Sequence, residues 1–276
     1  MLMRFLPLVL SGVFVAAGAP VQRLDPGVRE LTSAAAQYLA DYEQQFSFLL
    51  ADEVYTQQVV AGPTDGPDRR RMTGESFLTF LPGDRVWIAI HDIAEVDGHP
   101  VDDREDLKLL LQHEPVAGVA RVISARNARF NIGHIFRNFN EPTLGLLVLD
   151  PRRQPQFKFT RRNLDRDGAV TLATLAFKET DAPTIVHGTD GREVFSTGEI
   201  VLEAGAGRIR RTSLQFKFGA ITAALTTEFA LDPKLAMWVP SIFNERYEKA
   251  GRGRELVVGE ARYTNYRRFE VNARIK

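Results

Sequence analysis

The chain has 276 residues, carries 35 basic and 35 acidic side chains, and contains no cysteine. A balanced charge gives no reason to expect a nucleic acid or an anionic membrane surface as partner. The lack of cysteine excludes disulfides, thiolate catalysis, cysteine-ligated zinc and a lipid-modified N-terminal cysteine. The length allows one large β-rich domain or two of ordinary size.

The first residues are ordered as in a signal peptide. Arg4 supplies a positive charge, residues 5–17 are apolar, and small residues follow up to Ala19. This order is typical of export signals. The apolar run of about 13 residues is shorter than the roughly 20 that a membrane-spanning helix needs. Cleavage after Ala17 and cleavage after Ala19 both fit the pattern.

A buried first helix is the alternative interpretation of this segment, and Pro7 and Gly12 count against it. We therefore predict a signal peptide over residues 1–19 and a single domain over residues 20–276. The mature protein is expected to be periplasmic or extracellular, with no transmembrane anchor after cleavage.

Hydrophobic spacing and turn residues predict the elements of the first half. Asp25 and Pro26 start a helix that apolar residues at helical spacing extend to residue 49. A strand over 54–60 leads into a loop rich in proline and glycine, closed by three arginines, residues 69–71. The further predicted elements are strands over 76–81 and 86–96, a hairpin turn at Asp97-Gly98, helices through Leu107–Leu111 and after Pro115, and a buried apolar segment over 142–149.

The last 120 or so residues read as short strands separated by turns. Within them one face is apolar and the other polar or basic, as Leu214 and Phe216 beside Gln215 and Lys217 illustrate. An outer-membrane barrel alternates in the same way, but the helical first third and the basic last residues count against one. The predicted strands are 156–162, 170–177, 184–187, 193–203, 208–218, 221–231, 237–247 and 256–271.

No catalytic or metal-binding signature stands out. No two of the five histidines have the close helical spacing of a metal site. His91 and Glu95 could share a strand face, although surface histidines in a hairpin are the simpler interpretation. Nucleophile-elbow, phosphate-loop and dinucleotide patterns do not occur. We predict no enzyme, no metal and no cofactor, while a carboxylate pair that converges in space stays open.

Two charged clusters need an explanation. The acidic stretch from Asp92 to Asp106 has oxygen ligands that calcium prefers, but not the spacing of a calcium loop. A solvated hairpin tip that runs into a helix N-terminus explains it better, because acids are favourable there. The three arginines at 69–71 could meet this stretch or an anionic head group, or simply close a solvated loop.

Two stretches resemble a known family. Residues 77–83, Trp87 and residues 95–98 follow the order strand, Pro-Gly turn, strand, Asp-Gly turn of outer-membrane lipoprotein-sorting (LolA-like) proteins. Residues 238–240 and 261–269 resemble the closing strands of that superfamily. The chain is also similar to uncharacterised secreted bacterial proteins.

The resemblance implies an α+β fold: a large curved antiparallel sheet, an unclosed β-barrel, with helices packed on its concave side. In such a fold the concave side holds an acyl chain. The helices predicted between Asp103 and Leu149 depart from the compact carrier pattern. Because one fold supports several roles, including envelope stress sensing, the resemblance does not select the cargo.

The leading hypothesis is therefore a soluble periplasmic or secreted carrier that binds a lipid, a lipoprotein acyl chain or another apolar ligand by burial. The 18 phenylalanines either fill the core or line such a site. Each Å² of buried apolar surface contributes roughly 25 cal/mol, so burial alone would hold one acyl chain without any polar contact. An envelope interaction or stress-sensing protein without ligand is the alternative, and a hydrolase with dispersed residues is a third. The predicted ligand-binding residues are Phe80, Trp87, Phe216, Phe229 and Trp238.

Overall fold

The computed structural model describes residues 25–46, 48–63, 65–137, 141–188 and 190–269. The predicted signal peptide, residues 1–19, lies outside these ranges. Among the helices of the described ranges, none has both the length and the apolar character required to cross a bilayer.

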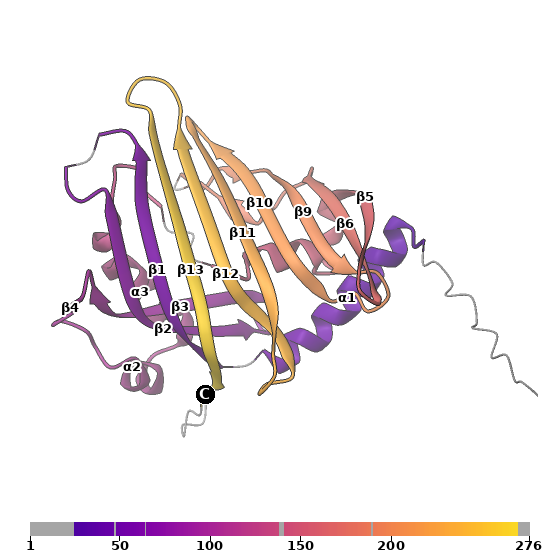
Figure 1. Ribbon diagram of the computed structural model, residues 1–276, viewed down its shortest axis with the longest axis horizontal. Coiled ribbons are helices and arrows are strands. Elements are labelled where there is room, and N and C mark those ends of the chain that lie inside the picture. Colours follow the sequence, from indigo (N-terminus) through magenta and orange to yellow (C-terminus); the bar gives the residue numbers. More distant parts are fainter. Residues whose placement is uncertain (1–24, 47, 64, 138–140, 189, 270–276) are drawn as a thin grey trace, which may run out of the picture.

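One antiparallel sheet of eleven strands forms the body of the protein (Figure 1). Its strand order is β4-β3-β2-β1-β13-β12-β11-β10-β9-β6-β5, so that β4 and β5 are its two edges and the barrel stays open. The strands are β1 Leu49–Ala61, β2 Arg69–Leu81, β3 Val86–Val96, β4 His99–Pro100, β5 Phe157–Asp167, β6 Val170–Glu179, β9 Ser196–Glu203, β10 Ile209–Phe218, β11 Ile221–Asp232, β12 Met237–Lys249 and β13 Glu255–Arg268. A separate pair joins β7 Val186–His187 to β8 Glu193–Val194.

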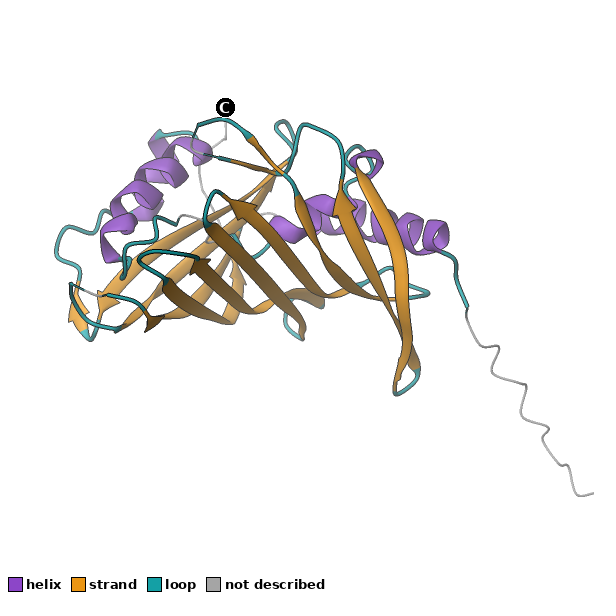
Figure 2. Cartoon of the chain, turned by 90° about the horizontal axis from the view of Figure 1, so that it is seen from above, coloured by secondary structure: helices purple, strands orange, loops and turns teal. Residues whose placement is uncertain are grey.

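Within the described residues, three α-helices and three short 3₁₀ turns complete the fold, and Figure 2 shows the helices against the sheet. This confirms the predicted α+β class with a large unclosed sheet. The helices are α1 Val28–Gln45, α2 Leu107–His113 and α3 Val116–Asn127, and the 3₁₀ turns are η1 Ala128–Phe130, η2 Leu144–Leu149 and η3 Gln154–Gln156. In α1 the buried residues Leu31, Ala35, Leu39 and Tyr42 recur at helical spacing and form one apolar stripe.

Neighbouring residues of β1 show which helix covers which face of the sheet. Leu49 belongs to the main core with α1 and η2, whereas Leu50 packs with Phe77 and with Ile123 of α3. Since successive strand residues point to opposite faces, α1 covers one face, here called the inner face, and α2 and α3 cover the other face of β1–β3.

Several boundaries differ from the predicted ones. The first helix ends at Gln45, because Phe46 has φ of −84° and ψ of 54°, outside the helical region, and β1 already begins at Leu49. The arginines at 69–71 belong to β2 and pair with residues 56–58 of β1 instead of closing the loop. Exposed Phe195 divides the strand predicted over 193–203 into β8 and β9.

Candidate functional site

The part of the inner face beneath α1 is apolar and aromatic, and we call it the apolar half. Trp87 of β3 is its centre: ring centroids of Phe80, Phe46 and Tyr42 lie 4.8, 5.1 and 5.8 Å from its own. Such tilted and edge-on ring pairs stabilise a core beyond the area they bury. The Nε1 of Trp87 and the hydroxyl of Tyr42 are buried without a hydrogen-bond partner among the described residues.

The five predicted ligand-binding residues are placed differently from one another. Phe80 and Trp87 are in ring contact and are only 5% and 6% exposed. Phe216 of β10 and Phe229 of β11 are buried in the same main core. Trp238 is partly buried at the margin of that core, with the guanidinium carbon of Arg210 3.9 Å from its ring centroid. Of the five, Phe80 and Trp87 are therefore in direct ring contact, and Trp238 makes a cation–π contact with Arg210.

Ion pairs fasten both ends of α1 to the rest of the chain. Arg85, in the turn after β2, lies 3.0 Å from Glu43 near the end of α1 and 2.9 Å from Asp150. At the other end, Arg161 of β5 lies 2.5 Å from Asp25. Partly exposed pairs of this kind contribute about 0–1 kcal/mol each.

The middle of α1 meets the turn before β10 at very short range. Gly207 has φ of +67°, and a Cβ at this position would lie 2.1 Å from the carbonyl oxygen of Ala34. Only glycine fits both the backbone angle and the space. The approach of α1 to the sheet thus depends on this residue.

The neighbouring part of the inner face is polar, and we call it the polar half. The register places Gln57 of β1 opposite Gly259 of β13, and Gly259 opposite Glu245 of β12. A Cβ on Gly259 would lie 2.6 Å from Oε1 of Glu245 and 2.8 Å from the hydroxyl of Tyr55. The missing side chain gives the glutamate and the tyrosine room to meet across β13.

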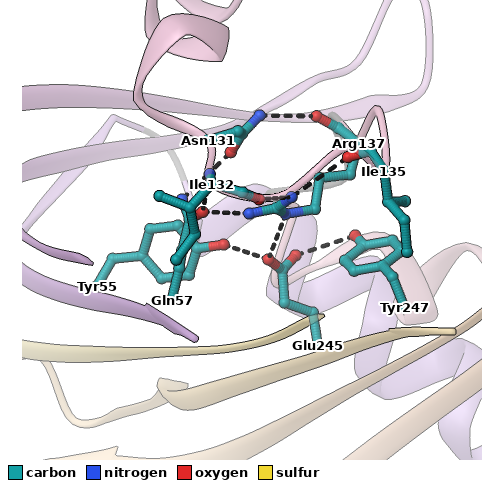
Figure 3. A network of polar contacts seen from close by, with 8 residues as sticks. All are labelled: Tyr55, Gln57, Asn131, Ile132, Ile135, Arg137, Glu245 and Tyr247. Atoms are coloured by element: carbon teal, nitrogen blue, oxygen red, sulfur yellow. Dashed lines mark hydrogen bonds and ion pairs between the residues drawn. The ribbon is translucent and has the colours of Figure 1, made fainter. Parts of the chain in front are cut away.

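Glu245 accepts hydrogen bonds from two tyrosines (Figure 3). The hydroxyl of Tyr55 donates to its Oε1, and the hydroxyl of Tyr247 donates to its Oε2 at 3.0 Å. Burial raises the pKa of the Glu245 carboxyl, and the hydrogen bond from Tyr55 and the charge of Arg137 oppose this shift. Burial likewise raises the pKa values of both tyrosines well above the ordinary range, so they stay protonated donors.

Arg137 faces this glutamate from the segment after α3 (Figure 3). Its Nε lies 3.9 Å from Oε1 of Glu245, and both side chains are only 2% exposed. The two terminal nitrogens donate to the side-chain oxygen of Gln57 and to the carbonyl oxygens of Ile132 and Ile135. Its Nε has no hydrogen-bond partner among the described residues.

A second buried pair lies on the same face. Nδ1 of His91 is 2.7 Å from Oε2 of Glu53. The backbone carbonyl of His91 accepts a hydrogen bond of 2.7 Å from the side chain of Asn127, at the end of α3. Because β4 pairs only with the last residues of β3, this contact lets α3 cover the remaining free edge of the sheet.

These groups line a partly open cavity of about 120 Å³, which is bordered by side chains of the inner face and, beyond the edge of β3, by residues of α3. It has room for about four waters at ~30 Å³ each. Burial raises the pKa of Glu141, which lines it, against the lowering effect of a hydrogen bond from Thr143. The lining combines the polar side chains Tyr55, Gln57, His91, Asn131, Arg137 and Glu245 with Ala120 and Ser124 of α3.

The acidic stretch is used in ion pairs with arginines. Arg104 binds Asp92 through two hydrogen bonds of 2.8 and 2.7 Å, and Arg70 lies 3.3 Å from Asp97. Of the interpretations left open for the 69–71 arginines, pairing with this acidic stretch is therefore found for Arg70. Across the described residues, no three histidine, aspartate or glutamate side chains converge as a metal site would require.

Sequence patterns had pointed to the aromatic residues and missed the polar half. Glu53, Tyr55 and Gln57 alternate along β1 on the face that the fold buries, and this alternation was a usable signal. Nothing local distinguishes Arg137 or Glu245 from the other charged residues, because strand pairing and a remote loop bring them together.

No protein-family model and no curated protein matches the chain. Among solved structures, the chain is similar to a putative outer-membrane lipoprotein-sorting protein domain from Vibrio parahaemolyticus, with 9% identity, a TM-score of 0.32, and 86% of this chain and 92% of that one covered. It is also similar to a DUF1329 family protein from Desulfovibrio piger, with 8% identity, a TM-score of 0.33, and coverage of 90% and 95%.

A third similar structure is the MucA/MucB complex of Pseudomonas aeruginosa, with 10% identity, a TM-score of 0.21, and coverage of 85% of this chain and 98% of that one.

Proposed function

We propose that this protein is an exported carrier that holds a lipid or another apolar ligand between α1 and the inner face of its sheet. One observation carries the proposal: α1 covers part of the main core of the sheet with an apolar stripe, and we infer that an acyl chain would bind where this stripe lies.

The energetics allow such an exchange. A ligand that replaces the apolar stripe of α1 gains roughly 25 cal/mol for each Å² of apolar surface it buries. This offsets the free energy that α1 loses when its own apolar surface is exposed. The ion pairs at the ends of α1 add little, because Arg85 and Arg161 are 24% and 31% exposed and are screened by solvent. The helix is therefore the cover that can give way while the sheet stays intact.

The cellular setting of the proposal comes from the sequence. A signal peptide over residues 1–19 and a single exported domain over 20–276 would place the carrier in the periplasm or outside the cell. Its partners would be a lipid or lipoprotein acyl chain and an envelope protein that delivers or receives it. Phe80, Trp87, Phe216, Phe229 and Trp238 remain the proposed ligand-binding residues, with Trp87 the most central.

The two tryptophans allow a direct test. The variant Trp238→Phe keeps only Trp87 as an emitter, and Trp87→Phe keeps only Trp238. We expect 9,10-dibromostearic acid, whose bromines quench tryptophan at contact range, to quench the first variant in a saturable way and the second much less. Stearic acid without bromine is the control for unrelated changes in emission.

The comparison of the two variants also defines the results that would contradict the proposal. Equal quenching of both tryptophans would indicate loose association with the surface, and no saturable quenching of Trp87 would remove the carrier proposal. Mass spectrometry of an organic extract of the purified protein then provides an independent check for a bound lipid.

A further inference from the structure

The polar cavity borders the apolar half along one strand. Trp87, Ala89 and His91 follow one another on the inner face of β3, and four residues of strand span about 13 Å. Ala89 packs against the main core and also lines the cavity. A molecule that lies beside Trp87 therefore reaches the cavity without leaving the inner face.

A second void shares one lining residue, Glu141, with the cavity. This void measures about 10 Å³, and its other walls include Leu214, Leu225 and Phe243. Polar and apolar walls thus meet at one side chain. A ligand that fits this arrangement is an amphiphile with a head group of only a few heavy atoms.

The charges around the cavity argue for an uncharged head group. Arg137 stands opposite Glu245, and His91 stands opposite Glu53, so each basic side chain already has an acidic neighbour. An anionic head group would lose its hydration on entry and find no unmatched positive charge. Glu141, the remaining acid of the lining, accepts a hydrogen bond from Thr143, and burial raises the pKa of its carboxyl, which favours the uncharged form and offers a cation little compensation. A neutral group that forms hydrogen bonds avoids this cost.

The hydrogen bonds left open point to hydroxyl groups. The Nε–H of Arg137 is buried and has no acceptor among the described residues, so it needs an oxygen. The carboxyl oxygens of Glu141 have several lone pairs and can accept a further hydrogen bond. A hydroxyl both accepts and donates, so two hydroxyls on adjacent carbons could serve both sites.

We propose that the polar cavity binds the uncharged polyol head group of an amphiphile, such as the glycerol of a monoacylglycerol, whose chain lies beneath α1. This assignment rests on the carrier function proposed above and names the class of its ligand. Arg137 donates to the head group, Glu141 accepts from it, and Trp87 contacts the first part of the chain.

Three lauroyl or dodecyl compounds with different heads test the assignment: 1-monolauroylglycerol, lauric acid and dodecyltrimethylammonium. Each competes with dibromostearic acid for the Trp238→Phe protein. Two additional hydrogen bonds predict that monolauroylglycerol binds about tenfold more tightly than either charged compound. The variant Ala120→Leu fills the cavity from α3 and should abolish this preference, whereas Ala125→Leu on the exposed side of the same helix should retain it.

The outcomes separate the two proposals. If none of the three compounds competes and dibromostearic acid does not bind, the carrier function fails and the head-group assignment falls with it. If all three compete equally, or a charged head is preferred, the carrier function stands and the assignment is wrong, with the cavity holding water only. A preference that survives Ala120→Leu would likewise contradict the assignment.

Discussion

The apolar and polar halves lie on one face of one sheet, but different interactions hold them together. The apolar half depends on the burial of rings and aliphatic chains against α1, which has no strict directional requirement. The polar half depends on hydrogen bonds between buried groups such as Tyr55, Glu245 and Arg137, and each bond has its own geometry. The apolar half can therefore exchange α1 for a ligand of similar apolar surface, whereas the polar half keeps a fixed geometry.

The largest expected effect comes from breaking the polar half. Arg137→Met removes the basic partner and leaves Glu245 as an uncompensated buried acid. Removal of one partner from a buried pair predicts a loss of about 3–5 kcal/mol in the free energy of unfolding, measurable by urea denaturation. Adding Glu245→Gln should restore a good part of it, because the double variant has no unpaired charge.

The double variant distinguishes a charge effect from a packing effect. If the combined changes cost as much as the sum of the single ones, the two side chains are not coupled. Strong coupling of the kind found between contacting groups would appear as a marked deviation from that sum.

The next effect concerns the apolar half. Leu39→Ala in α1 should lower the free energy of unfolding by about 2–4 kcal/mol, because Leu39 is 1% exposed and its loss leaves a hole beneath the helix. Ile123→Ala in α3 is the matched control, equally buried but in the cluster on the opposite face.

Ligand binding separates these two variants. Leu39→Ala should bind dibromostearic acid more tightly than the parent protein, since the ligand fills the space and α1 competes less. Ile123→Ala should bind it unchanged. Weaker binding by Leu39→Ala, or equal effects of the two substitutions, would show that the ligand does not replace the stripe of α1.

A smaller effect is expected at the contact that fastens α1. Arg85→Met removes the pairs with Glu43 and with buried Asp150 and should cost about 1–2 kcal/mol of stability. Stopped-flow quenching should show faster entry of the brominated fatty acid. Arg246→Met, which removes only an exposed pair with Glu248, should alter neither quantity, and an unchanged entry rate in Arg85→Met would exclude α1 as the moving cover.

The two halves also differ in how far the sequence could foretell them. Alternation and turn residues located almost every strand, because each strand buries one face and ends at glycine or at a polar turn. Trp87 and Phe80 were predicted as ligand-binding residues of the sheet, and the structure shows that both side chains are buried. Partners remote in sequence were beyond reach: Arg137 meets Glu245 only through the strand order and the path of the segment after α3.

The smallest effect tests the polar half by pH. Burial raises the pKa of Glu141, so the folded protein keeps this proton at pH values where the unfolded chain has lost it. Folding then binds a proton, and this group reduces stability as the pH rises through the window above the ordinary glutamate pKa. The variant Glu141→Gln has no such titrating group. Its free energy of unfolding relative to that of the parent, measured by urea denaturation, should therefore rise between pH 5 and pH 8.

Glu193→Gln gives the opposite sign and serves as the control. Hydrogen bonds from Thr184 lower the pKa of Glu193, so its ionised form stabilises the fold above the ordinary glutamate pKa and this benefit disappears as the pH falls. The relative stability of Glu193→Gln should therefore worsen as the pH rises. If both variants shift in the same direction, the Glu141 carboxyl is hydrated in the cavity and not held in a low-polarity environment, which would weaken the case for an uncharged head group beside it.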